Sequence, residues 1–385
     1  MPCCWILPTL SLLAALPGSL AHARGVHRAR VVRDAGDIGA AYDYIVVGGG
    51  TAGLTVADRL TEDPATTVLV VENGILDDSA SILRVQGGSG GLNPRFLYDI
   101  TSVPQPHLRN RSAPVLAGNV VGGSSAVNGM MCVRGTAEDY DRWGRFFDGD
   151  DGDDVASRDN SSSSLSSDWS WHGMLPYFRK ALRFVPPRVD VARSANISYD
   201  ARFWGADGTS GVFAGWPSFQ YADTALFYNA YAQIPGAQFP IDSGAGQAGV
   251  FWYPTFMDPA SVTRSYARTG HYDRQQNRSN YHLVTGSRVD RVLLNGTTAV
   301  GVHVVAAARR DANTNTTTPR QVLARREVIL AAGAIHTPQV LQLSGIGPAQ
   351  LLAAANITPV VDLPGVGQNF QDHPSLAISI ACECK

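Results

Sequence analysis

Three glycines and one carboxylate near the start of the chain have the spacing of a dinucleotide-binding site. Gly48, Gly50 and Gly53 form a Gly-x-Gly-x-x-Gly pattern, and Glu72 follows after the usual interval of about 20 residues. In this pattern the first glycine allows a tight turn, the second admits a pyrophosphate and the third lets a helix pack on a strand. A carboxylate at the second strand end can bind ribose hydroxyls and would repel the 2′-phosphate of NADP. The alternative is a glycine turn between packed elements.

The surrounding sequence predicts the elements that would position these residues. Tyr42–Val47 is a short apolar run of strand type, and apolar residues at helical spacing follow the glycines. Asp63–Pro64 breaks that helix, and Thr67–Val71 reads as a second buried strand that ends at Glu72. These segments predict the start of a β-α-β unit. FAD and NAD share this half-site, so the pattern alone does not choose between them.

Two longer motifs resemble those of one enzyme family. Gly122–Met130 (GGSSAVNGM), followed by Arg134–Gly135, resembles the first signature of the glucose-methanol-choline (GMC) oxidoreductases. Gly333–Gly347 (GAIHTPQVLQLSGIG) resembles their second signature, and Val366–Pro374 extends the likeness. Within this family the chain looks closest to secreted fungal members, including aryl-alcohol oxidases, glucose oxidases and the cyclase versicolorin B synthase. The resemblance also includes Pro104–Gln105 and a strand over 285–292.

The resemblance implies that the cofactor is FAD and assigns roles to particular residues. The pyrophosphate would be held by four residues, Gly48, Gly50, Thr51 and Ala52. Gly53 would complete their turn. Glu72 would bind the adenosine ribose, and Val289 would offer its backbone to adenine. A further set would line the flavin: Val120, Ser124, Asn128, Gly129, Met130 and Met131.

The resemblance also implies a reaction, although no residue of this chain matches the catalytic base of the family. GMC enzymes take a proton from an alcohol with a C-terminal histidine and pass hydride to the flavin. This chain stops at Lys385, which predicts a chain truncated before that region, with no catalytic residue to assign. His336 and His373 lie inside family motifs, and we expect structural roles for both. His271, His282 and His303 are expected to have hydrogen-bond partners.

The amino-acid composition favours small molecules as the binding partners. The chain has 385 residues, 44% of them hydrophobic, and its 31 Lys and Arg nearly balance 33 Asp and Glu. This balance excludes collagen-like, coiled-coil and wholly disordered chains. No basic block is long enough to neutralise several phosphates, so nucleic acid is not an expected partner. Because the chain also resembles the GMC oxidoreductases, the expected partners are an alcohol substrate and oxygen or another electron acceptor.

The first residues predict export from the cell. Trp5–Leu20 is a short apolar run, and Ala21–Ala23 supplies a small-x-small cleavage site, so residues 1–23 read as a secretory signal peptide. A membrane anchor is the alternative. Seven glycosylation sequons agree with a secreted glycoprotein: Asn110, Asn160, Asn196, Asn277, Asn295, Asn315 and Asn356. Three cysteines remain after cleavage, too few for a disulfide scaffold or a zinc site: Cys132, Cys382 and Cys384.

The predicted fold is α/β, with a Rossmann-like FAD-binding domain and an inserted α+β substrate domain. The FAD-binding region would span 42–352, with a low-complexity, disordered insertion over 148–168 and a largely substrate-domain segment over 169–280. Residues 353–385 would begin an incomplete C-terminal portion.

Within the FAD-binding region, Asn295–Gly296 predicts a hairpin, Glu327–Gly333 another buried strand, and Pro338 the start of a helix.

Two alternatives to alcohol oxidation also fit the sequence. Some relatives keep FAD and catalyse redox-neutral cyclisation or lyase chemistry. A truncated chain without catalysis is the second alternative.

Overall fold

The computed structural model describes residues 30–32, 38–79, 82, 93–146, 168–205, 211–218, 220, 222–307 and 319–372. The predicted signal peptide and all but the last residue of the predicted insertion over 148–168 lie outside these ranges. So do His373, Cys382 and Cys384. Within these ranges, no helix has both the length and the apolar character needed to cross a membrane.

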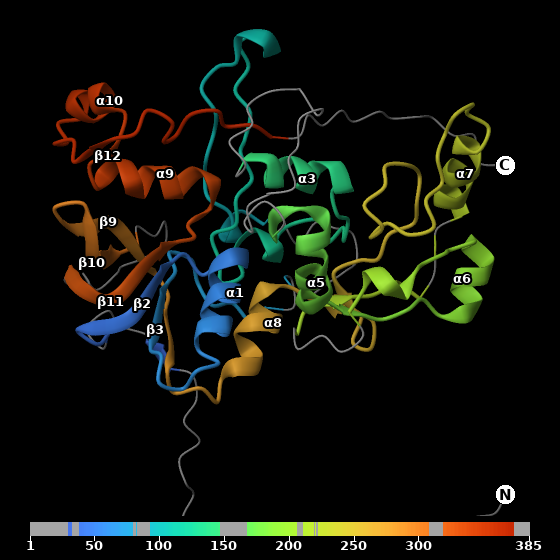
Figure 1. Cartoon of the computed structure of the whole chain (residues 1–385), viewed down its shortest axis with the longest axis horizontal. Coiled ribbons are helices and arrows are strands. Elements are labelled where there is room, and N and C mark those ends of the chain that lie inside the picture. Colours follow the sequence, from blue (N-terminus) through green and yellow to red (C-terminus); the bar gives the residue numbers. More distant parts are fainter. Residues whose placement is uncertain are drawn as a thin grey trace, which may run out of the picture.

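A seven-stranded mixed sheet forms the centre of the fold, with the order β1-β8-β3-β2-β11-β10-β9 (Figure 1). Its strands are β1 (Arg30–Val32), β2 (Ala41–Val47), β3 (Val68–Val71), β8 (Tyr281–Val284), β9 (Ser287–Asn295), β10 (Thr298–Ala306) and β11 (Arg320–Leu330). The pairs from β1 to β11 are parallel, whereas β11, β10 and β9 pair antiparallel. The predicted α/β class is confirmed.

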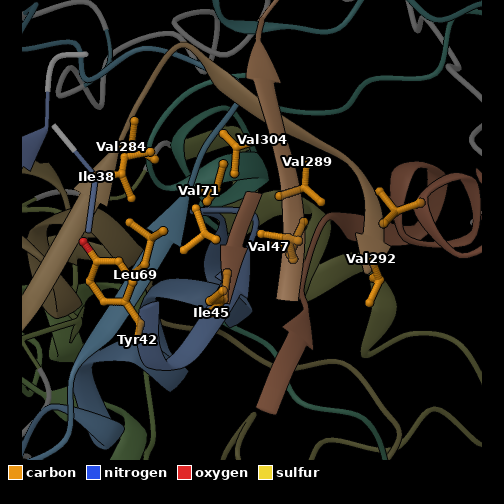
Figure 2. Packing of buried hydrophobic residues seen from close by; sticks show 13 residues of the cluster. Ile38, Tyr42, Ile45, Val47, Leu69, Val71, Val284, Val289, Val292 and Val304 are labelled. Atoms are coloured by element: carbon orange, nitrogen blue, oxygen red, sulfur yellow. The ribbon is translucent and has the colours of Figure 1, made fainter. Parts of the chain in front are cut away.

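Alternate residues of the parallel strands enter two separate cores. Ile45, Val47, Leu69 and Val71 join a cluster with valines of the antiparallel strands, and Figure 2 shows Val289 and Val304 facing them. The intervening residues Val46, Val68 and Val70 join a second cluster with Leu54 and Ala57. Burial on both faces explains why these segments read as continuous apolar runs. The predicted strand, glycine turn, helix and strand are confirmed.

Helix α1 (Thr51–Leu60) is held tightly against β2 because Gly53 has no side chain. A Cβ on Gly53 would lie 1.9 Å from the carbonyl oxygen of Gly48 and 3.1 Å from a methyl carbon of Val46. Helix α8 (Ala267–His271) lies beside α1 (Figure 1) and shares its core through Ala267.

Several expected boundaries are wrong. Helix α9 (Gly333–Leu343) starts directly after β11, so Pro338 lies inside the helix and does not open it. Proline inside a helix removes one backbone hydrogen bond, and packing of Val340 against the sheet outweighs that local preference. The strand expected over 285–292 begins two residues later: β8 ends at Val284 and β9 begins at Ser287, because Gly286 turns with φ +65°.

One further strand prediction is corrected, and the hairpin prediction is confirmed with a shift in its turn. β11 begins at Arg320, and the segment expected as a buried strand, Glu327–Gly333, is only partly buried and stops at Leu330. The hairpin at Asn295–Gly296 is confirmed, but Asn295 is the last paired residue and pairs with Thr298. Only Gly296, with φ +60°, has a left-handed conformation there, which suits a turn with glycine in its first central position.

The remaining elements form a more irregular lobe and a C-terminal segment. The lobe contains α3 (Ala137–Phe146), α5 (Trp171–Ala181), α6 (Val189–Ala195), α7 (Ala222–Tyr231), and the strand pairs β4 (Arg183–Phe184) with β5 (Phe213–Ala214) and β6 (Met257–Asp258) with β7 (Thr263–Arg264). Its core contains Phe184, Trp204 and Trp216. The last elements are β12 (Ile346–Gly347), α10 (Ala349–Ala354) and β13 (Val361–Asp362). Short 3-10 turns cover Pro94–Phe96, Pro106–Leu108, Gly123–Ala126, Ala201–Phe203 and Asp273–Gln275.

Replacing Gly53 with alanine tests this packing. Alanine favours a helix by up to about 1 kcal/mol, but its methyl group would collide with the Gly48 carbonyl. We expect Gly53→Ala to lower the free energy of unfolding by about 1–3 kcal/mol in denaturant titrations. Gly365→Ala is the control, because a Cβ there meets nothing within 4 Å, and should change stability by under about 0.5 kcal/mol. Equal stabilities for the two variants would contradict the packing argument.

Candidate functional site

The two glycine-rich motifs meet backbone to backbone at the carboxyl end of the parallel strands. A Cβ on Gly123 would lie 2.7 Å from the Cα of Gly50, and the backbone N–H of Gly122 donates to the carbonyl of Gly49 at 2.8 Å. Gly48 has φ +106°, which glycine adopts without strain. The motifs therefore form one continuous surface of main chain, although they lie far apart in the sequence.

Two helices direct their N-termini at a single large cavity. Helix α1 has Gly50 as its N-cap and α9 has Ala332, and neither cap makes a side-chain hydrogen bond. The first residues of both helices line the cavity. Free N–H groups and the positive end of the helix dipole favour an anion there.

Glu72 lies at the end of β3 with its carboxylate buried and facing this cavity. Its oxygens accept hydrogen bonds from the backbone N–H groups of Gly49 at 2.7 Å and Gly74 at 2.6 Å. Burial raises the pKa of Glu72 to about 7, although both N–H groups act to lower it. A carboxylate has about four acceptor positions, so this group retains capacity for ligand hydroxyls.

The cavity has a volume of about 1820 Å³, more than the roughly 300–1,000 Å³ typical of small-ligand pockets. It is therefore large enough for a dinucleotide. Seven of the residues predicted from the sequence lie on its wall: Gly48, Gly50, Thr51, Ala52, Glu72, Ser124 and Val289.

The other six predicted residues are not on this wall. Gly53 lies beneath the turn, where it packs α1 on β2, and Val120 and Met130 are buried. Asn128 accepts a hydrogen bond from Arg264 at 2.8 Å. A Cβ on Gly129 would point into open space, and Met131 is exposed.

Several cavity residues were not identified from the sequence. Asn73 and Arg288 line the wall next to the predicted Glu72 and Val289, and this adjacency was the available signal. The rings of Tyr98 and His336 pack at a tilt of 39°, with centroids 4.2 Å apart. Burial lowers the pKa of His336, which favours the neutral form of its imidazole. No local pattern marks Tyr98, because only tertiary structure brings it to His336.

The three histidines expected to have partners do have them. Nδ1 of His271 lies 2.8 Å from the buried carboxylate of Asp58, and Nδ1 of His303 lies 2.8 Å from Asp290. Nδ1 of His282 lies 2.8 Å from the hydroxyl of Tyr42. The prediction is confirmed, and these imidazoles serve the packing of the sheet and of α8 on α1.

Comparison with known proteins identifies one family and several similar chains. The family model described as GMC oxidoreductase matches residues 42–195 and 237–375. The dehydrogenase xptC of Emericella nidulans is 42% identical over 333 residues, which are 86% of this chain and 49% of that protein. A GMC oxidoreductase family protein of Malassezia sympodialis, Mala s 12, is 34% identical and matches over 89% of this chain and 52% of its own length.

Solved structures agree with these sequence relatives. An FAD-dependent oxidoreductase from Chaetomium thermophilum matches with a TM-score of 0.74 and 39% identity, over 86% of this chain and 52% of that one. A fungal aryl-alcohol oxidase matches with a TM-score of 0.72 and 35% identity, with the same coverage of 86% and 52%. The chain therefore spans about half the length of the relatives it matches.

The buried Glu72 carboxylate predicts a specific pH dependence of stability. Between its ordinary pKa of 4.5 and about 7, the folded chain keeps a proton that the unfolded chain releases. The free energy of unfolding should therefore fall as pH rises through this window, by up to about 3 kcal/mol, and level off above it.

Thermal melts of wild type and Glu72→Gln between pH 4 and pH 8 measure this contribution. The variant should lack that slope, whereas replacing the exposed Glu327 with glutamine should leave it unchanged. Parallel profiles for wild type and Glu72→Gln would refute the effect.

Proposed function

The chain belongs to the GMC oxidoreductase family, which is FAD-dependent, and we propose that it binds FAD as part of an enzyme oxidising the CH–OH group of a small-molecule alcohol. The observation that carries this proposal is the contact of the Gly48–Gly53 turn with the Gly122–Met130 loop beside Glu72. One cavity thus presents main-chain donors for an anion and a carboxylate for hydroxyl groups.

The ADP half of FAD fits the residues on the cavity wall. Gly48, Gly50, Thr51 and Ala52 would hold the pyrophosphate, because side-chain-free backbone and the start of α1 allow close approach. Glu72 would accept hydrogen bonds from the adenosine ribose. Val289 would present its main chain to adenine from β9.

The flavin half would lie along the Gly122–Met130 loop and its continuation. Ser124 lies on the cavity wall, next to the point where Gly123 contacts Gly50. The remaining predicted flavin residues follow it along the chain or support it from behind: Val120, Asn128, Gly129, Met130 and Met131. Gly53 would support the turn that holds the pyrophosphate.

The proposed reaction divides the work between the cofactor and the chain. The chemistry that bound FAD would supply is acceptance of a hydride from the alcohol carbon, with oxygen or another acceptor as the final electron acceptor. The chain's own residues hold the ADP half, orient the flavin and shield the site from water. No residue of this chain is assigned as the base that takes the hydroxyl proton.

We propose the same domain organisation that the sequence predicts. The FAD-binding region would span 42–352, with the insertion over 148–168 and a substrate segment largely over 169–280, and 353–385 would begin the C-terminal portion. The separate aromatic core around Trp204 and Trp216 supports a distinct lobe.

Anaerobic mixing of the FAD-loaded chain with an aryl alcohol tests the activity. We expect stoichiometric FAD uptake by this chain, and bleaching of the oxidised flavin absorbance, as alcohol is converted to aldehyde, when the C-terminal histidine region of the family is also present. Product formed while the flavin stays oxidised would instead indicate cyclase or lyase chemistry. A chain that binds FAD but is not bleached by any alcohol would contradict catalysis by this chain, and a chain without FAD would contradict the whole proposal.

We also propose that the protein is secreted and glycosylated, and five sequons support this. Asn110, Asn196, Asn277, Asn295 and Asn356 are all exposed, so each is accessible for modification. In protein secreted by a eukaryotic host, enzymatic glycan release in heavy-oxygen water should mark these five asparagines by mass spectrometry. The buried Asn280, which is outside any sequon, is the internal control. Secreted protein with all five sites unmodified would refute glycosylation.

A further inference from the structure

Arg264 is a fully buried cation directly behind the proposed flavin loop. It ends strand β7 and is 2% exposed. Its Nε donates to the carbonyl of Ile82 at 3.1 Å, and its Nη1 donates to the carbonyl of Ser125 at 3.1 Å and to Oδ1 of Asn128 at 2.8 Å. Two of these three acceptors belong to the Gly122–Met130 loop.

Arg264 has no carboxylate partner among the residues that the structure describes. Its neighbour in sequence, Arg268, is also largely buried but forms ion pairs with Asp78 and Asp273. The acceptors that contact Arg264 in the described part of the chain are all neutral, so none of them offsets its positive charge. A guanidinium keeps its proton even when buried, and the low dielectric of the interior lets such a charge act over a longer distance.

The acceptor Asn128 connects this charge to the backbone of the loop. Its Oδ1 also accepts the backbone N–H of Met130 at 3.1 Å. Met130 has φ +61°, a left-handed conformation that residues with a side chain rarely adopt, so it requires support from its surroundings. The Arg264–Asn128 contact provides that support.

The residues after Arg264 hold the same loop at a second point. Ser125 Oγ donates to the carbonyl of Gly122 at 2.6 Å and accepts the backbone N–H of Ala267 at 3.2 Å. The segment from Arg264 to Ala267 therefore clamps both the start and the end of the loop. Such a clamp orients any group that the loop contacts.

We propose that Arg264 is a positioning residue for the flavin, which fixes Asn128 and Met130 and supplies a positive charge that favours the reduced, electron-rich cofactor. This inference rests on the proposed function, because it requires FAD on the Gly122–Met130 loop. A fixed positive charge near a site where negative charge develops stabilises that charge. The reduction potential of bound FAD should therefore be higher than in a chain without this charge.

Spectroelectrochemical titration of the FAD-loaded full chain tests the proposal with three variants. Arg264→Met removes the charge and the clamp, and should shift the potential to more negative values and weaken FAD binding at least tenfold. Asn128→Asp keeps the acceptor for Arg264 and Met130 but adds a carboxylate that cancels the charge, and should also lower the potential. Arg264→Lys keeps the charge and should stay closer to wild type in potential than either.

Arg278→Met is the matched control, because Arg278 is a partly buried arginine that pairs with Asp58 away from the loop. It should lower thermal stability without shifting the potential. An unchanged potential in both Arg264→Met and Asn128→Asp, with FAD bound, would overturn the inference and leave the proposed function intact. A wild-type chain that takes up no FAD would overturn both, and if Arg264→Met does not fold, Asn128→Asp alone decides.

Discussion

The close contact between two backbones that carry no side chains determines the shape of the site. Gly50 and Gly123 meet at a distance that leaves no space for a Cβ on Gly123, and Gly118 lies equally close to the Gly123 carbonyl. A side chain on Gly123 would therefore push the Gly122–Met130 loop away from α1. At this contact the cavity wall is main chain, which suits a phosphate, whereas side chains such as those of Tyr98, Arg288 and His336 line other parts of the cavity.

Three of the buried ionisable side chains in the described ranges, Asp58, Glu72 and Arg264, are each stabilised in a different way. Asp58 is surrounded by donors from Arg59, His271 and Arg278, so its charge is balanced and its role is to join α1 to α8. Glu72 has two N–H donors and no cation among the described residues, and Arg264 has carbonyl and amide acceptors and no acid. Incomplete compensation is costly in an apolar interior, so it tends to mark functional positions. Glu72 and Arg264 lie at the two predicted ends of the cofactor site.

Sequence patterns predicted the β2-α1-β3 unit almost to the residue, because burial on both faces and the three glycines constrain each position locally. The same locality explains the confirmed hairpin and the position of Gly48, Gly50 and Glu72 on the cavity wall. The other four wall residues were assigned from the family resemblance: Thr51, Ala52, Ser124 and Val289. Predictions failed where tertiary contacts outweigh local preference: Pro338 is retained inside α9, and β11 is longer and more exposed than its apolar end suggested. Tyr98 lies on the cavity wall in ring contact with His336, a contact between distant segments that no spacing could reveal.

The irregular lobe was the least predictable part, because its strands are two residues long and are stabilised by side chains from distant segments. Trp204 donates its indole N–H to Asp242 at 2.8 Å, and the Arg134 guanidinium lies 4.5 Å from the centre of the Trp204 ring. This lobe is nevertheless coupled directly to the flavin loop. The N–H of Phe256 donates to the carbonyl of Met130 at 2.8 Å, and the N–H of Cys132 donates to Pro254 at 3.1 Å. Met130 is thus held by Asn128 on one side and by the lobe on the other, so a shift of the lobe on binding a substrate would reach the proposed flavin contact through a single peptide.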